Sequence, residues 1–451
     1  MTSSTTAPHT PSGPPTPVRI AALAFIFVTV VLDMLALGII VPVLPKLVLA
    51  FEGGDSAHAA TIYGLFGTVF AAMQFLFAPL LGAISDRFGR RPVILLSNLA
   101  LGLDYVVMAL APSVGWLFVG RVLAGICSAS FSVPSAYIAD VTPPEKRAAS
   151  FGLLSAAFGL GFVVGPAFGG LLGIVDPRLP FWVAAGLSLA NALYGLLVLP
   201  ESLPPGRRGA FDGRSANPIG ALFLLRRHPQ VLGLGAVMFL FAVAHEVQPS
   251  MWVLYTDYRY GWDARTVGLT LAAVGLLSAV VGVWVVGFVV GRLGERRGLL
   301  LGLASAAAGF TVYGLATSGA VFVTAIPLVS LLGVAGSSAQ ALMTRGVDPT
   351  EQGRLQGALS ALQGVAHMIG PALFTGVFAL AVGGGATVAT PSGRTTAGAV
   401  VASPTGANGA ATSGIHPGGA ATIGDLAGAP FLLAAGFLVA ALFLGWRVTR
   451  R

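Results

Sequence analysis

The sequence G-A-I-S-D-R-F-G-R-R-P, from Gly82 to Pro92, occupies the first short gap between apolar runs. A degenerate copy, G-F-V-V-G-R-L-G-E-R-R-G, runs from Gly287 to Gly298, 205 residues further along the chain. The same displacement of 205 residues relates two other features of the sequence, taking Gly152 to Gly357 and the pair Gly165-Pro166 to Gly370-Pro371. The repeat indicates two homologous halves, each of about six membrane segments.

The composition is that of a membrane protein. Of the 451 residues, 55% are hydrophobic and 9% are charged, with a mean hydropathy of +0.85, whereas about a quarter of a soluble domain is charged. An apolar run of about 20 residues can cross the hydrocarbon core as a helix. We therefore predict an all-α fold of twelve transmembrane helices in two six-helix halves, with spans near 19–42, 59–81, 92–111, 114–137, 149–173, 179–199, 231–254, 266–290, 298–316, 320–343, 354–382 and 429–446.

Polar stretches divide the chain. The first half is expected at 19–199 and the second at 231–451, joined by a polar, basic cytoplasmic linker at 200–230. Residues 1–18 are rich in Thr and Pro and carry no positive charge, which favours a disordered cytoplasmic tail over a cleaved signal. Residues 383–428, built mainly from Gly, Ala, Thr, Ser and Pro, are expected to form a flexible outer loop without chemistry of its own.

The net charge of +8 follows the membrane topology and does not indicate a nucleic-acid partner. With a cytoplasmic N-terminus, five basic residues fall outside, namely Lys46, Arg178, Arg259, Arg265 and Arg394. Apart from Arg121, which lies within a predicted span, the rest fall inside: Arg19, Arg87, Arg90, Arg91, Lys146, Arg147, Arg207, Arg208, Arg214, Arg226, Arg227, Arg292, Arg296, Arg297, Arg345, Arg354, Arg447, Arg450 and Arg451. The positive-inside rule therefore places both termini in the cytoplasm.

Ionisable residues inside predicted spans are candidates for function, because an exposed charge in lipid costs several kcal/mol. Counting along the spans at about 1.5 Å per residue brings Asp33, Asp104, Arg121 and Glu246 to a similar depth, where they could share one layer. Asp33 and Asp104 are interpreted as proton acceptors or substrate contacts, and an ion pair with Arg121 is compatible with that role. Glu246 could instead be solvated, and His367 is either a proton relay or a packing histidine.

Glycines mark one span as a close-packing element. Gly161, Gly165, Gly169 and Gly173 are spaced by four residues, which gives a helix face without side chains against which another helix can pack. Pro166 interrupts the hydrogen-bond ladder of the same span. The pattern predicts a pivot between helices.

These motifs resemble those of the major facilitator superfamily, specifically its proton-coupled drug antiporters. S-D-R-F-G-R-R (Ser85 to Arg91) is similar to the loop signature of the superfamily, L-F-V-G-R-V-L-A-G (Leu117 to Gly125) to its fourth-span arginine motif, and G-P-A-F-G-G (Gly165 to Gly170) to its antiporter motif. The resemblance implies an inner-side latch between the halves, formed by Gly82, Asp86, Arg87, Gly89, Arg90 and Arg91. It also assigns Gly161, Gly165, Pro166, Gly169 and Gly170 to helix packing.

Within that superfamily the chain looks most like the tetracycline efflux antiporters, over Ile20 to about Ala381. Asp33 and Asp104 match acidic positions that the family uses for transport. Two positions depart from the family pattern, because Ala306 stands where a carboxylate is expected and Ser278 where a histidine is expected. Glu246 is our candidate for a relocated carboxylate.

The leading hypothesis is an inner-membrane transporter that exports a small amphipathic drug, with tetracycline-type compounds the best single guess, in exchange for protons. Export of a sugar or endogenous metabolite is an alternative, and a non-transporting receptor is a third. No G-x-x-x-x-G-K-[ST] loop, H-E-x-x-H or G-x-S-x-G motif is found, so neither ATP use nor an enzyme is expected. We expect no cofactor and no bound metal, and the proton gradient supplies the energy. A divalent cation that travels with the substrate is left open. We expect the protein to function as a monomer in contact with membrane lipid. The single cysteine, Cys127, excludes an internal disulfide.

Overall fold

A computed structural model describes residues 17–128, 132–142, 144–203, 206, 229–345, 352–385 and 426–450. The predicted tail (1–18), linker (200–230) and loop (383–428) therefore lie largely outside the described residues. The helices of the first half are α1 (Pro17–Ile40), α2 (Leu44–Phe51), α3 (Ser56–Phe88), α4 (Arg90–Leu110), α5 (Val114–Ser128), α6 (Ser132–Val141), α7 (Pro144–Val175) and α8 (Leu179–Val198). Those of the second half are α9 (Pro229–His245), α10 (Val247–Tyr260), α11 (Ala264–Val280), the π-helix η4 (Val281–Val285), α12 (Val286–Leu315), α13 (Gly319–Thr324), α14 (Ile326–Ser330), α15 (Leu332–Arg345), α16 (Gln352–Gly385), η6 (Leu426–Gly428) and α17 (Ala429–Val448).

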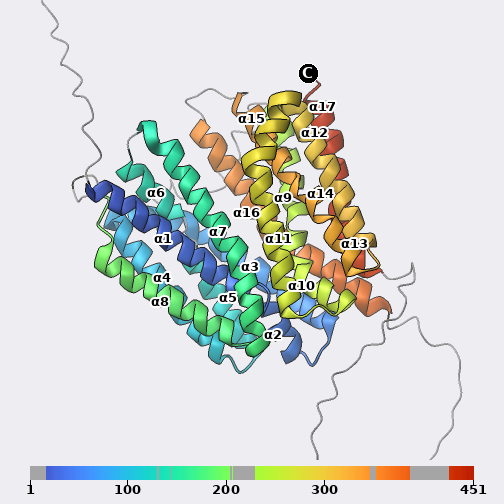
Figure 1. Ribbon diagram of the computed structural model, residues 1–451, viewed down its shortest axis with the longest axis horizontal. Helices are drawn as coiled ribbons and strands as arrows, with labels where there is room; N and C mark the ends of the chain where they lie inside the picture. Colours follow the sequence, from blue (N-terminus) through green and yellow to red (C-terminus); the bar gives the residue numbers. More distant parts are fainter. Residues whose placement is uncertain are drawn as a thin grey trace, which may run out of the picture.

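The helices form two bundles side by side, one from each half of the chain (Figure 1). In the first bundle α1 packs on α7 and α4 on α8, while in the second α12 packs on α15 and α17. The bundles meet mainly through two pairs of helices, α3 with α16 and α7 with α11, and α10 also touches α2 and α3. The predicted fold class, an all-α membrane protein of two helical halves, is confirmed.

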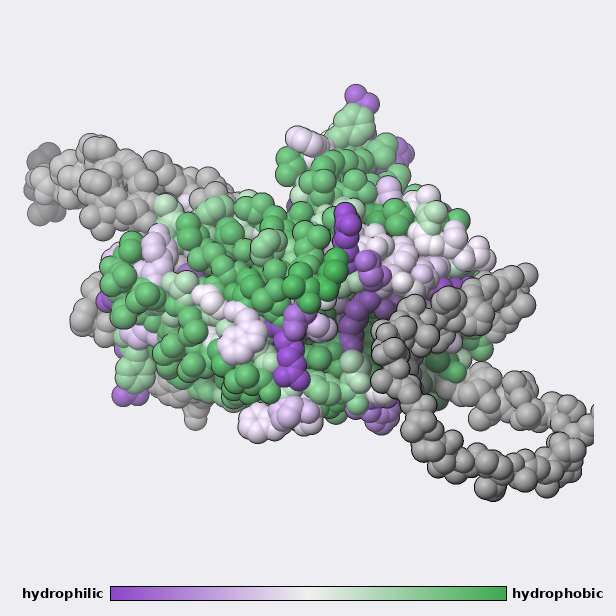
Figure 2. Space-filling view, turned by 60° about the horizontal axis from the view of Figure 1, so that its bottom comes forward, coloured by the Kyte–Doolittle hydropathy of each residue, from purple (hydrophilic) through white to green (hydrophobic). Residues whose placement is uncertain are grey.

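The described residues hold ten apolar helical segments long enough to cross a membrane. One of these, Ala264–Leu315, has 52 residues and is divided by non-helical backbone at Gly294, so it is long enough for two spans. A shorter apolar stretch, Gly159–Val175 in α7, supplies a further one, and the total is consistent with twelve spans. Figure 2 shows hydrophobic residues over most of the visible face, as expected of a surface that meets lipid.

The internal repeat extends to the backbone conformation. Gly89 ends α3 with φ 109°, and Gly294, 205 residues later, has φ 77° inside α12. Both values lie in a region that only glycine adopts readily, and each allows a sharp turn between two helical segments. Pro166 in α7 and Pro371 in α16, related by the same displacement, both lie inside helices.

The glycine face of α7 lies directly against α1. A side chain added at Gly161, Gly165 or Gly169 would collide with the backbone of α1 near Leu35, Gly38 or Ile39. On another side of α7, Gly170 meets the backbone of Ala264 in α11. The small residues therefore let α7 contact both its own half and the second half at close range.

Asp263 caps α11, and this cap gives a stability prediction. Its carboxylate accepts a hydrogen bond from the Thr266 N–H at 2.8 Å. Hydrogen bonding to the Thr266 side chain and, to a lesser extent, this backbone bond lower the pKa of Asp263 below its ordinary value. A lowered pKa means that the contribution to stability is present at neutral pH and is lost as pH falls through the pKa. Asp263→Ala should lower the free energy of unfolding by about 1 kcal/mol. Asp263→Asn should keep the cap at neutral pH and lose the acid dependence, which thermal unfolding in detergent as a function of pH would measure.

Candidate functional site

A cavity of about 300 Å³ lies between the two halves. Its lining is mainly apolar and includes Leu37, Phe66 and Phe70 from the first half. The charged or titratable side chains that line it are Tyr63, Arg121, Glu246 and His367. An apolar cavity with a few placed polar groups is the usual form of a site for a small amphipathic molecule. We call it the central cavity.

Glu246 and His367 meet in the central cavity, with the imidazole Nε2 3.3 Å from the carboxylate Oε1. Glu246 occupies the break between α9 and α10, so the chain turns where the carboxylate points inward. On α16, Gly370 leaves room for the Glu246 side chain, and His367 lies about one turn before it. The sequence identified both residues but not their contact.

Arg121 of α5 supplies the positive charge of the first half to the same cavity. Its guanidinium lies over the ring of Phe70 at 4.5 Å from the ring centroid, a favourable cation–π position. Tyr63 of α3 lies close enough to interact electrostatically with both Arg121 and Glu246. The cavity thus has a cationic side chain, Arg121, from the first half and a carboxyl group, Glu246, from the second.

Asp33 and Asp104 are buried within the first half and do not line the central cavity. Asp33 in α1 accepts a hydrogen bond from the Asn191 amide of α8 at 2.8 Å. Asp104 in α4 is 2% exposed, and neither of its oxygens has a hydrogen-bond partner among the described residues. No ion pair joins Asp104 to Arg121 in this part of the chain. Of the four residues that could share one layer, Arg121 and Glu246 therefore line the central cavity, whereas Asp33 and Asp104 are buried within the first half.

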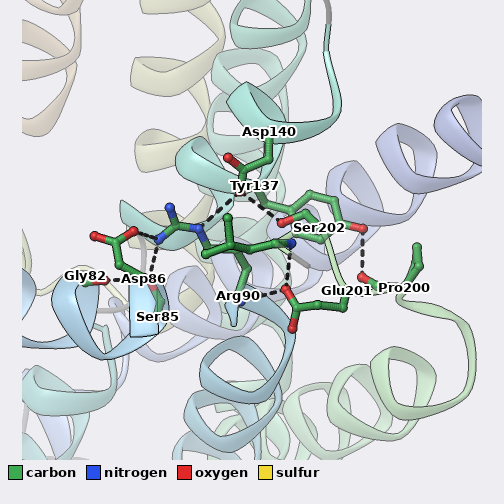
Figure 3. A network of polar contacts seen from close by, with 10 residues as sticks. Gly82, Ser85, Asp86, Arg90, Tyr137, Asp140, Pro200, Glu201 and Ser202 are labelled. Atoms are coloured by element: carbon green, nitrogen blue, oxygen red, sulfur yellow. Dashed lines mark hydrogen bonds and ion pairs between the residues drawn. The ribbon is translucent and has the colours of Figure 1, made fainter. Parts of the chain in front are cut away.

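A polar network surrounds Arg90 at one end of the first bundle, here called the Asp86 end (Figure 3). The Arg90 guanidinium contacts Asp86 at 2.6 Å and Asp140 of α6 at 3.2 Å. Its backbone N–H donates to Glu201, which follows α8, at 2.9 Å. Arg90, Asp86 and Asp140 belong to the first half, and Glu201 lies just after it, at the start of the predicted linker. A latch between the halves through Asp86 remains a prediction, whereas Asp140 and Glu201 were not expected as its partners.

The second half repeats the ion pair of Arg90 and Asp140 with its charges exchanged. Arg345 contacts Glu295 at 2.7 Å, and the displacement of 205 residues takes Arg90 to Glu295 and Asp140 to Arg345. Positions 90 and 140 carry opposite charges, and so do the corresponding positions 295 and 345. A comparison of these charges across the repeat could have identified Asp140 from the sequence.

Arg90→Gln should destabilise the protein, because it leaves the Asp140 carboxylate in a mostly buried site without its cation. Removing one partner of a buried pair costs about 3–5 kcal/mol, and the Arg90 side chain is 11% exposed. The matched control is Arg297→Gln, an exposed arginine of the second copy, which should change little. Thermal unfolding of both purified variants measures the difference, and equal stability would contradict a structural role for the network.

At the opposite end, here called the Lys46 end, the two halves are joined directly. The Lys46 ammonium contacts Asp257 of α10 at 2.8 Å and also donates to the backbone carbonyl of Trp262. The sequence suggested no role for either side chain. No group of three or more His, Cys, Asp or Glu side chains that could hold a metal ion occurs among the residues that the structure describes.

Comparisons with known proteins agree on one family. Residues 26–371 match the model of the Major Facilitator Superfamily. The chain is 40% identical to the tetracycline resistance protein, class C, of Escherichia coli, over 79% of this chain and 90% of that protein. It is 36% identical to the class G protein of Vibrio anguillarum, over 78% and 89%. Among solved structures, a bacterial homologue of the human lysosomal transporter Spinster, inward-facing and unoccupied, is similar in fold with a TM-score of 0.71, at 19% identity over 96% of this chain and 98% of that one.

Proposed function

The chain belongs to the major facilitator superfamily, and from this premise we propose that it exports a tetracycline-type drug across the cytoplasmic membrane in exchange for protons. The observation that carries the proposal is the central cavity, which is apolar enough for an amphipathic drug and holds Arg121, Glu246 and His367 as its charged groups. Identities of 40% and 36% to tetracycline resistance proteins favour the drug class. Superfamily members are transporters that act on small molecules and are not enzymes.

Carboxylates that can gain and lose a proton are what proton coupling requires. Asp33, Asp104 and Glu246 are such groups, each buried inside a span. Arg121 and His367 supply charges that can compete with the proton for these carboxylates. No further cofactor is needed for this cycle, and a divalent cation could enter only with the drug. A single chain encloses the cavity, which supports a monomer as the functional unit.

The orientation of the protein in the membrane is inferred from its charge distribution. We place the Asp86 end in the cytoplasm and the Lys46 end outside, because basic residues concentrate at the Asp86 end. An ion pair joins the halves at the Lys46 end, whereas among the described residues the ion pairs at the Asp86 end each stay within one half. This arrangement corresponds to an inward-open state in which the drug would enter from the cytoplasm.

A susceptibility panel tests the proposed function. The chain, expressed in a host that lacks its own efflux pumps, should raise the tolerated concentration of tetracyclines, and everted vesicles should accumulate the drug when a pH gradient is imposed. Unchanged tolerance to tetracyclines, together with transport of a sugar or metabolite, would favour the alternative exporter. Absence of any transport by the folded protein would contradict the proposal.

The Lys46–Asp257 contact predicts a shift between the two transport states. A partly exposed ion pair contributes up to about 1 kcal/mol, so Lys46→Gln should shift the balance toward outward-open by up to about fivefold. A cysteine replacing Ser250, which lines the central cavity, in a Cys127→Ser background would report this as faster labelling from the Lys46 end. Adding Asp257→Asn to Lys46→Gln should give little further change, since the pair is already broken. Equal labelling rates with Lys46 present and with Lys46→Gln would contradict a role for this contact.

A further inference from the structure

A second cavity, of about 180 Å³, lies inside the second half beside the junction of α9 and α10. Its polar lining comes from three parts of the chain, with His245 and Gln248 at the junction, Ser278 in α11 and Ser330 in α14. It shares no lining residue with the central cavity. We call it the side cavity.

Broken helices border the side cavity. The α9 helix ends at His245 and α10 begins at Val247, while α14 is a five-residue helix between breaks at Ala325 and Leu331. Irregular backbone at membrane depth is tolerated where it lines a cavity that can supply hydrogen bonds.

The side cavity is suited to water. The Gln248 Nε2 atom is buried and has no hydrogen-bond partner among the described residues, and an amide left in that condition destabilises the fold. A water occupies roughly 30 Å³ at liquid density, so the side cavity has room for several. Water in the side cavity would satisfy Gln248.

His245 is the titratable side chain in this lining, and it lies next to the charged pair of the central cavity. Its ring is nearly parallel to that of Phe241, at 6.5 Å between centroids. Glu246 follows it in the chain, and His367 of α16 is near enough to interact with it electrostatically. The side chains that line the cavity from α11 and from α14 to α15 are uncharged, so the titratable groups beside His245 are Glu246, its neighbour in the chain, and His367, which interacts with it electrostatically.

We propose that the side cavity is a water-filled proton reservoir and that His245 carries protons between it and the Glu246–His367 pair. The inference rests on the proposed proton-coupled transport. The imidazole accepts a proton at one ring nitrogen from a protonated water of the side cavity, which leaves neutral water, and releases the proton of the other nitrogen to the Glu246 carboxylate. The ring ends neutral, as its other tautomer, and one proton has moved to Glu246. The route lets Glu246 exchange protons while the drug fills the central cavity.

Hydration is tested first, without measuring transport. Ser278→Cys and Ser330→Cys, each in the Cys127→Ser background, should react with a small water-soluble methanethiosulfonate, because the reactive thiolate forms only in contact with water. The matched control is Ser188→Cys in α8, which is 0% exposed and should react at least about tenfold more slowly. Failure of both cavity cysteines to react faster than the control would overturn the reservoir.

The relay is tested with His245→Gln, which keeps a polar side chain of similar length but cannot carry the proton. In proteoliposomes, pH-driven drug accumulation should fall about tenfold or more, while exchange of labelled for unlabelled drug, which needs no net proton movement, should continue at the wild-type rate. The control is His58→Gln, whose side chain is 61% exposed near the Lys46 end, and which should behave as wild type.

The outcomes separate the relay from a structural role and from the proposed function. Normal pH-driven accumulation by His245→Gln overturns the relay, and so does equal loss of exchange and accumulation, which marks a folding or drug-contact role. If the wild-type chain moves no tetracycline, the proposed function fails, and the reactivity of Ser278→Cys and Ser330→Cys still decides whether the reservoir exists.

Discussion

Asp33→Asn should abolish pH-driven drug export while leaving the protein folded. The carboxylate is 4% exposed in α1 and accepts a hydrogen bond from the Asn191 amide. Asparagine keeps the size and the polar contact but cannot bind and release a proton at this site. Because positioned proton transfer contributes about 10²–10⁴ in rate, export in everted vesicles should fall by about 100-fold or more.

Two further variants make the Asp33 result specific. Asn191→Ala removes the partner but keeps the carboxylate, so it should retain most of the export. Asp104→Asn should lower export or drug affinity and should also stabilise the fold, because it replaces a buried carboxylate whose oxygens lack hydrogen-bond partners. Unchanged transport by both Asp33→Asn and Asp104→Asn would remove these residues from the mechanism.

Glu246→Gln is the second change for which we expect a large loss. The carboxylate lines the central cavity and contacts His367, so it can exchange a proton in response to the drug. The glutamine amide cannot exchange a proton, so pH-driven export should fall about tenfold or more, while drug binding to the purified protein persists. Normal export between about pH 6 and pH 8 would show that coupling rests on the first half alone.

A rescue experiment locates the site of the second-half carboxylate. Ala306 stands where the family pattern expects a carboxylate, but it is 0% exposed in the core of the second half and lines neither cavity. Ser250 lines the central cavity one helical turn beyond Glu246. In the Glu246→Gln background, Ser250→Asp should therefore restore part of the export, and Ala306→Asp should not.

The sequence by itself predicted the features that depend on local pattern. Apolar runs determine where helices span, since a helix satisfies its own backbone hydrogen bonds in lipid. The displacement of 205 residues indicated two homologous halves, and the related glycines Gly89 and Gly294 both have positive φ in the structure. The spacing of Gly161, Gly165 and Gly169 indicated a close-packing face, which lies on α1.

Only the tertiary structure decided which charges meet. Position along a span gives the depth of a side chain, but each residue turns the helix by about 100°, so depth does not determine the face. Asp33 thus lies at a similar predicted depth to Glu246, yet it contacts Asn191, while Glu246 contacts His367. The Lys46–Asp257 contact depends likewise on how the two halves pack. These contacts join helices distant in sequence, and their geometry arises from packing between helices, which no local pattern encodes.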